Sequence, residues 1–274
     1  MSTSAADLQS FIDQSDNIFA QAKIEAMALA PNTVQVWPGG AVFNTIQAAI
    51  ESITGAGPQE QYQVAVGSGT FNENIVMKDY VYVIGAGQDI TIITAPAQQD
   101  PRNGVVNSAS GCGMSELTIN APGAAWGAWP IGINICGSGK FHISGVTINC
   151  GMGGTGDNVR AITNNIGSHG GSVILGSSIL HVTGDNQSGC SGIELFGTSA
   201  ILPFTLFINL TAIVVTGGGQ NYGVTTAIYA TVTLNDSKII ANSYSLYNSD
   251  GTGLITANQC TIDGPVSGGV VVNN

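Results

Sequence analysis

The pattern of apolar positions changes near residue 62 of the 274-residue chain. Before that point, residues 4–29 place an apolar side chain every three or four positions, which is typical of an amphipathic helix. A Pro-Gly-Gly break at 38–40 ends this region, and a second, short helix is predicted over 43–54. From residue 62 onward, apolar and polar residues alternate in short β-branched segments, which indicates half-buried strands.

Seven of these short segments resemble one another. Each begins with a small or polar residue and continues into an apolar alternation, and their proposed equivalent positions are spaced by 23 to 34 residues: Ile92, Leu117, Val146, Ile179, Ile213, Ile239 and Ile262. A persistent period with variable loops is typical of stacked coils. Intervening segments such as GINICG and GIELFG add further strands, which gives two or three per coil, and the dipeptides that form tight hairpins are scarce. The pattern therefore predicts an all-β fold, a right-handed parallel β-helix with an N-terminal helical cap.

The predicted β-helix sets the domain organisation. Residues 1–40 form an amphipathic helix and a linker, and residues 41–274 form a single domain with a capping helix at 43–54 and coils over 62–274. Because each coil of a solenoid contacts only its neighbours, both ends need a cap. The N-terminal helix either packs on the body or serves as an oligomerisation arm, so a homo-oligomer is one expectation.

Charge and cysteine content exclude some classes of partner. Six Lys and Arg against 17 Asp and Glu give a net charge of −11, which repels nucleic acid. No apolar run approaches the ~20 residues of a membrane-spanning helix. The N-terminus lacks the charged and apolar regions of a secretory signal, so we expect a cytoplasmic protein or export by a non-classical route. Five cysteines without CxxC spacing are expected to be small buried core residues.

The segment from residue 43 to residue 94 resembles the N-terminal portion of the pectinesterase family, within the pectin-lyase-like β-helix superfamily. FNTIQAAIESI matches the helix that caps the first coil in that family. Gly69, Phe71 and Glu73 occupy the family's Gly-x-Tyr-x-Glu turn, with Phe in place of Tyr. A Gly-x-Gly and a Thr-x-Ile follow in the family's order. The resemblance implies a helix-capped parallel β-helix.

The catalytic blocks that the resemblance implies are largely missing. In the family, two Asp residues act as nucleophile and acid/base, glutamines hold the oxyanion and an Arg orients a carboxylate. IGINICG lacks the first Gln, and GTGDNVRA keeps Asp157 but has Gly156 in place of the second. SGIELFG has Ile193 where the other Asp would fall, and no Arg-Pro-Trp exists because Arg160 is the last arginine. The sequence therefore predicts that the chain is not a functional pectinesterase.

Two loops hold candidate site residues. Asp157 and Arg160, in GMGGTGDNVR, are either an acid and its orienting cation at a cleft or a surface ion pair that contributes little. Trp126 and Trp129, in APGAAWGAWP, either form a stacking wall for a sugar ring or are buried by a loop that folds back on the coil.

Alternation in SGIELFG places Glu194 and Phe196 on one face of a strand. We expect Ile193 and Leu195 to fill the core and Glu194 to point outward as an exposed strand residue, with a ligand contact and a buried paired charge as alternatives. In this interpretation Glu194 is not a displaced copy of the family's catalytic Asp. The candidate catalytic residues are Asp157, Arg160 and Glu194, and the candidate ligand-binding residues are Trp126, Trp129 and Phe196.

The sequence contains no recognisable metal or cofactor motif. His142, His169 and His181 lack any ligand spacing, and His142 and His181 are expected to be exposed strand residues. P-loop, Rossmann and G-x-S-x-G fingerprints are absent from any strand–helix context. Neither a metal nor a cofactor is predicted.

Three functional hypotheses remain. The first is a protein that acts on or binds a neutral glycan, or a similar ligand, in the lateral groove of the β-helix. The second is a non-catalytic structural or adhesive module of a surface, appendage or phage-type assembly. The third is an intracellular enzyme whose groove is repurposed for a small apolar substrate. A structure distinguishes these three hypotheses, because it shows whether the candidate acids, Arg160 and the tryptophans line one cleft.

Overall fold

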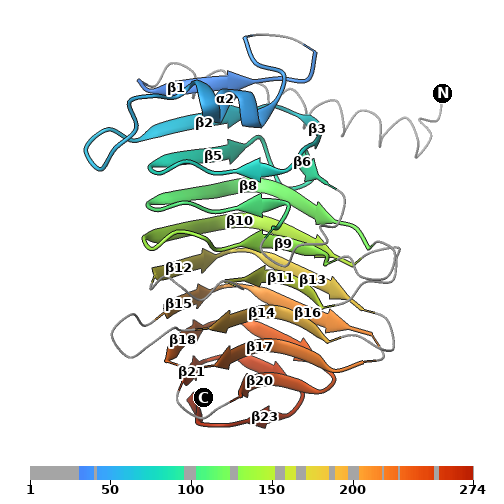
Figure 1. Ribbon diagram of the computed structural model, residues 1–274. Coiled ribbons are helices and arrows are strands. Elements are labelled where there is room, and N and C mark those ends of the chain that lie inside the picture. The colour runs from blue at the N-terminus through green and yellow to red at the C-terminus, as the bar shows by residue number, and fades with distance from the viewer. Residues whose placement is uncertain are drawn as a thin grey trace, which may run out of the picture.

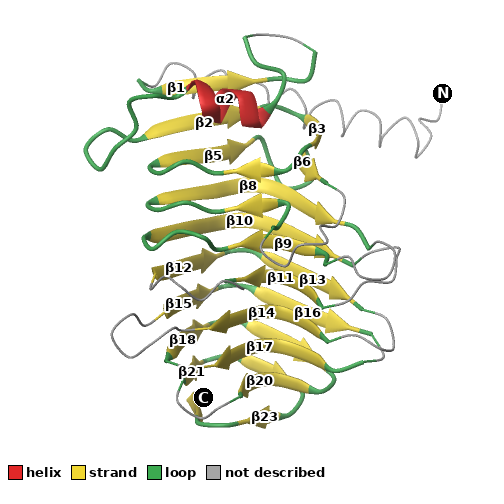
Figure 2. Ribbon diagram, in the orientation of Figure 1, coloured by secondary structure: helices red, strands yellow, loops and turns green. Residues whose placement is uncertain are grey.

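A computed structural model of the chain describes eleven stretches separated by short gaps: residues 31–39, 42–95, 103–123, 129–151, 158–164, 171–184, 189–196, 204–217, 219–227, 229–249 and 253–273. The predicted helix at 4–29 lies outside them, as do Trp126, Asp157 and His169. The described residues form one short helix and a column of parallel strands (Figures 1 and 2). The predicted parallel β-helix is confirmed.

The strands stack into three parallel faces, because each complete coil contributes one strand to each face. Face 1 contains β1 (Thr33–Val36), β2 (Tyr62–Val66), β5 (Val81–Gly85), the first half of β8 (Cys112–Ala121) and of β10 (Lys140–Cys150), β12 (Gly171–Gly176), β15 (Phe204–Asn209), β18 (Ala230–Asn235), β21 (Leu254–Asn258) and β24 (Val270–Asn273). Face 2 contains β3 (Gly69–Asn72), β6 (Thr91–Thr94), the second halves of β8 and β10, β13 (Ile179–Thr183), β16 (Ala212–Thr216), β19 (Lys238–Ala241) and β22 (Thr261–Asp263). Face 3 contains β4 (Ile75–Val76), β7 (Val106–Asn107), β9 (Ile131–Asn134), β11 (Val159–Thr163), β14 (Cys190–Phe196), β17 (Asn221–Ala227), β20 (Tyr244–Asn248) and β23 (Val266–Ser267).

A column of stacked aliphatic side chains runs along face 2. Its members occupy one register position in successive coils: Ile93, Ile119, Ile148, Leu180, Ile213, Ile239 and Ile262. The sequence-based alignment is right for the last three and wrong by one or two residues for the first four. Leu117 and Ile119 are both buried on the same strand, so apolarity alone does not distinguish positions two apart.

The helix α2 (Ile46–Ser52) lies within the predicted range and caps the first coil. The Oγ1 atom of Thr45 accepts a hydrogen bond from Ala48 N. The carboxylate of Glu73, from the turn after β3, accepts hydrogen bonds from Ile46 N at 2.8 Å and Gln47 N at 2.9 Å. Glu73, the last residue of the Gly-x-Tyr-x-Glu turn, therefore satisfies two of the N–H groups that are free at the start of the helix.

Face 3 packs closely across the core against face 2 at β14 and β16. A Cβ added to Gly192 of β14 would lie 2.3 Å from Ile213 Cγ2 and 2.6 Å from Gly223 O, closer than atoms can approach. Gly192 therefore lets β14 approach both β16 and its neighbour β17.

The five cysteines are free. Three of them, Cys112, Cys150 and Cys190, are buried in the core. The expectation of full burial is wrong for Cys136 and Cys260, which are partly exposed.

Candidate functional site

Arg160 of β11 and Glu194 of β14 form an ion pair on the outer surface of face 3. The parallel register pairs Arg160 with Ser191 and Ile162 with Ile193, and skips the residue between them. It also pairs Thr163 with Glu194, so Arg160 and Glu194 lie on adjacent strands three positions out of register. Arg160 Nε donates to Glu194 Oε2, and the two side chains are only 10% and 17% exposed.

Two further contacts hold the guanidinium of Arg160. Its Nη1 donates to Asn158 O at 3.3 Å, and its central carbon lies 5.2 Å from the ring centroid of Trp129, a cation–π distance. Burial lowers the pKa of Arg160 to about 10, which leaves the guanidinium charged at neutral pH. The site therefore contains a charged pair packed against an indole ring.

A hollow of about 250 Å³ extends from this pair along face 3. Its lining includes Ser191, Phe196, Gln220, Tyr222, Thr225, Tyr247 and Ser249, besides Asn158, Gly189, Arg160 and Glu194. The lining residues come from successive coils, because the register places Glu194 beside Thr225, and Thr225 beside Tyr247. The groove therefore crosses the strands and runs along the axis of the β-helix.

Three tyrosines form an aromatic cluster at the far end of the groove. The rings of Tyr222 and Tyr244 are stacked with centroids 6.0 Å apart, and Tyr247 lies 5.2 Å from Tyr222 and 4.9 Å from Tyr244. All three are partly exposed, and burial together with the other two tyrosines raises the pKa of Tyr222. At neutral pH Tyr222 therefore presents an uncharged ring with a hydroxyl group.

Two threonines lie on either side of Glu194 in the same register column, Thr163 on β11 and Thr225 on β17. Both hydroxyls are buried, and neither has a hydrogen-bond partner among the described residues. Because buried hydroxyls normally have a partner, the hydroxyl of Thr225, which lines the groove, is a candidate to bond a ligand group.

Four of the candidate site residues come together here: Trp129, Arg160, Glu194 and Phe196. Ile193 and Leu195 are buried, as predicted for the inner side of this strand. The expectation that Glu194 is exposed is wrong, because its pairing with Arg160 covers most of the side chain. Asp157, the expected partner of Arg160, and Trp126 lie outside the described residues.

Sequence reasoning missed the tyrosine cluster. Tyr222 lies on β17, whereas Tyr244 and Tyr247 lie on β20, so alternation within one strand does not bring them together. Aligning NYG with the preceding CSG places Tyr222 beside Ser191, which is the signal that would have located the cluster.

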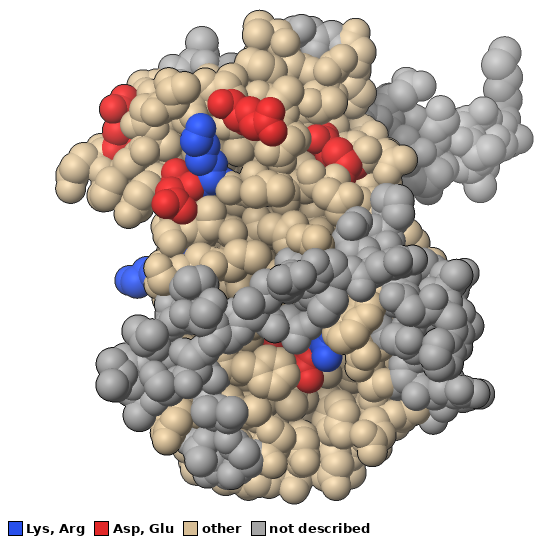
Figure 3. Space-filling model, in the orientation of Figure 1, with Lys and Arg blue, Asp and Glu red and all other residues tan. Residues whose placement is uncertain are grey.

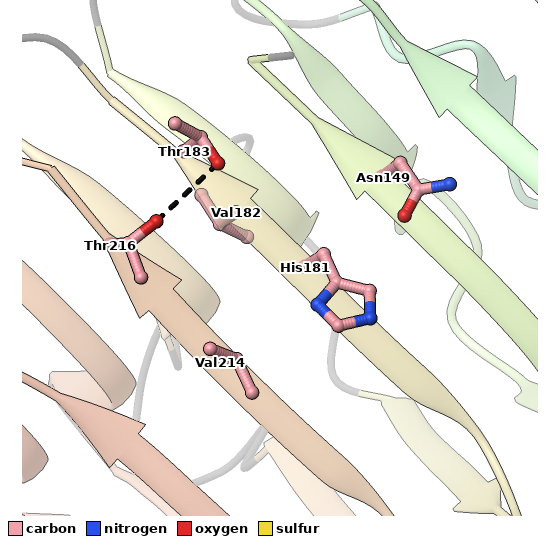
Figure 4. Close-up of a pocket in the computed structure, with 6 residues that line it drawn as sticks. All are labelled: Asn149, His181, Val182, Thr183, Val214 and Thr216. Atoms are coloured by element: carbon pink, nitrogen blue, oxygen red, sulfur yellow. Dashed lines mark hydrogen bonds between the residues drawn. The ribbon is translucent and has the colours of Figure 1, made fainter.

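Face 2 carries a second, shallower hollow of about 330 Å³ (Figure 4). It spans β10, β13 and β16 and includes Asn149, His181, Val182, Thr183, Val214 and Thr216. His181 is exposed, as predicted, whereas His142 is partly buried 6.5 Å from the ring of Tyr82, and this burial lowers its pKa. Within the described ranges, no three His, Cys, Asp or Glu side chains are grouped to hold a metal.

Charged side chains are sparse on the surface seen in Figure 3. Acidic groups gather around α2, while the lower coils show one place where blue and red atoms adjoin.

In the part of the chain that the structure describes, no helix is long and apolar enough to cross a membrane.

No protein-family model and no curated protein matches the chain. Solved structures do match. Pectin methylesterase from carrot superposes with a TM-score of 0.63 at 15% identity, over 90% of this chain and 89% of that one. Pectin methylesterase from Aspergillus niger, in deglycosylated form, gives a TM-score of 0.54 at 17% identity, over 87% of both chains. The chain therefore has the parallel β-helix fold of pectin methylesterases.

Proposed function

We propose that the groove on face 3 binds a neutral glycan and that the chain is not a functional pectin methylesterase. The observation that carries this proposal is the arrangement of the groove: the rings of Tyr222 and Tyr247 line one end, and polar side chains form the floor that leads to the Arg160–Glu194 pair. Binding sites for small molecules commonly combine apolar walls with a few polar groups that fix orientation.

The floor offers hydrogen-bonding groups of the kinds a sugar needs. Glu194 accepts hydrogen bonds, while the hydroxyls of Ser191 and Thr225 both donate and accept. The hydroxyl of Thr225 has no partner among the described residues, so a ligand hydroxyl would satisfy it. The apolar face of a sugar ring would rest on Tyr247.

The groove is long enough for an extended ligand. Arg160 and Tyr247 lie three strands apart on face 3, which corresponds to about 14 Å at the usual spacing between strands. A chain of several sugar units would therefore lie along the axis of the β-helix.

Among the described lining residues, Glu194 supplies the one carboxylate, and it is already paired with Arg160. Glycoside hydrolysis normally uses two carboxylates. The pectinesterase mechanism, as the resemblance implies it, likewise needs two acids, and Ile193 stands where one of them would fall. These features support binding over hydrolysis.

Calorimetric titration with a panel of neutral hexasaccharides, including methyl-esterified hexagalacturonate, tests the proposal. We expect Tyr247→Ala to weaken binding by about tenfold and Tyr247→Phe to retain most of it. Phe207→Ala, which removes an exposed aromatic ring from face 1, is the matched control and should change nothing. Absence of binding to the whole panel, or release of methanol from the ester, would contradict the proposal.

One observation favours a second candidate, a structural or adhesive module. Asparagine amides bond to one another along face 1, Asn235 to Asn209 at 2.7 Å, Asn258 to Asn235 at 2.9 Å and Asn273 to Asn258 at 2.8 Å. Such a ladder stiffens the stack of coils. A rigid rod that binds no sugar of the panel would fit this candidate.

A further inference from the structure

The groove on face 3 has a particular balance of charge. Among its described lining residues, Arg160 and Glu194 are the two charged ones, and they are paired with each other. The groove therefore offers no free charge to a ligand, although the chain as a whole carries a net charge of −11.

Arg160 has little capacity left for a ligand. Its Nε is bonded to Glu194, its Nη1 to the carbonyl of Asn158, and one face of the guanidinium lies under Trp129. The side chain is 10% exposed. These partners use two of the five N–H groups, and a ligand carboxylate could take the Nε edge of the guanidinium only by displacing Glu194.

Displacement would be unfavourable for two reasons. The incoming carboxylate would lie beside Glu194, and like charges at this distance repel. The carboxylate that loses Arg160 would remain mostly buried without a counter-charge, which is strongly destabilising. An uncharged sugar avoids both costs, because it can donate its hydroxyls to Glu194 while the ion pair stays intact.

We infer that Glu194 determines the specificity of the groove: by holding Arg160 it excludes uronic acid units and selects uncharged sugars. This inference rests on the proposed glycan-binding function, which it refines. The inference also predicts that removing the charge of Glu194 would reverse the preference for uncharged sugars over uronic acids, because the buried guanidinium of Arg160 would then need an anion.

The variant Glu194→Gln tests the inference. The amide is close to the carboxylate in size, and its oxygen can still accept a hydrogen bond from Arg160 Nε, so the change removes charge with little change in shape. Binding of hexagalacturonate, a hexasaccharide of uronic acids, is measured by calorimetry at low salt. We expect Glu194→Gln to bind it about 10- to 100-fold tighter than the unmodified protein, and the gain to fall as salt is added.

Two further variants separate the ion pair from the overall charge. In the double variant Glu194→Gln with Arg160→Gln neither charge remains, so the gain in hexagalacturonate binding should disappear. Glu51→Gln removes one negative charge from an exposed residue of α2 outside the groove and should leave hexagalacturonate binding unchanged.

The outcomes distinguish this inference from the proposed function. If the unmodified protein binds the neutral panel but Glu194→Gln gains no affinity for hexagalacturonate, the specificity role of Glu194 is wrong and glycan binding stands. If the neutral panel does not bind and Glu194→Gln still gains affinity for hexagalacturonate, the binding of neutral glycans and their selection are wrong, and only the masking of Arg160 by Glu194 stands. If Glu194→Gln does not fold, as shown by circular dichroism, the unmodified protein decides: equal affinity for hexagalacturonate and its methyl ester overturns the inference.

Discussion

The side chain of Asn164 forms hydrogen bonds with both backbone polar groups of Phe196. Its Oδ1 accepts from Phe196 N at 2.7 Å, and its Nδ2 donates to Phe196 O at 2.6 Å. Asn164 directly follows β11, and Phe196 is the last residue of β14. The side chain therefore joins the end of the strand that carries Arg160 to the end of the strand that carries Glu194.

We expect Asn164→Ala to destabilise the protein by about 2–4 kcal/mol, because it removes a buried side chain and leaves two partly buried backbone groups of Phe196 without these partners. The free energy of unfolding in urea measures the effect. Asn164→Asp keeps the acceptor but loses the donor, so its free energy of unfolding should also lie below that of the unmodified protein. Asn72→Ala, at an exposed strand position, is the control, and equal stability of the two alanine variants would contradict the role of Asn164.

The sequence predicted the features that depend on local pattern. Alternation placed Ile193 and Leu195 inside and Glu194 outside, and the apolar spacing over 43–54 located α2. The pairing of Arg160 with Glu194 joins residues 34 positions apart and depends on the lateral register of β11 and β14. Loop lengths vary from coil to coil, so alternation along one strand leaves that register undetermined, and the tyrosine cluster was missed for the same reason.

The resemblance over residues 43–94 includes Glu73, whose carboxylate caps the start of α2. We expect Glu73→Gln to lower the free energy of unfolding by about 1 kcal/mol, because the amide can accept from only one of the two N–H groups and carries no charge for the helix terminus. Glu51→Gln, on the exposed side of the same helix, is the matched control in the same urea titration. Equal losses in the two variants would show that Glu73 does not act as a cap.

Gly192 and Gly176 provide a matched pair of substitutions. Gly192→Ala should destabilise the protein by about 2–3 kcal/mol, because its Cβ would collide with Ile213 on the facing strand and with the backbone of Gly223. A Cβ on Gly176, at the end of β12, meets no atom within 4 Å, so Gly176→Ala should change the free energy of unfolding by less than about 1 kcal/mol. Similar losses in both would indicate that backbone freedom, and not the contact with β16, requires the glycine at 192.

Buried thiols should make the protein less stable at alkaline pH. Burial raises the pKa of Cys150 to about 12 from its ordinary value of 9.0, and burial does the same for Cys112. Because the folded value lies above the unfolded one, the unfolded state loses its proton first, and stability present below pH 9 is lost progressively as the pH rises towards 12. Between pH 8 and pH 10, ionisation of each of these two thiols in the unfolded state should lower the free energy of unfolding by about 1.4 kcal/mol.

Urea titrations at pH 8 and pH 10, with reductant present, measure this loss. Cys150→Ala should be less stable at pH 8, because it leaves a cavity in the core, but its stability should fall less between the two pH values. Gly176→Ala, which leaves every thiol in place, should keep the slope of the unmodified protein. A slope that Cys150→Ala leaves unchanged would show that ionisation of the buried Cys150 thiol does not contribute to alkaline unfolding.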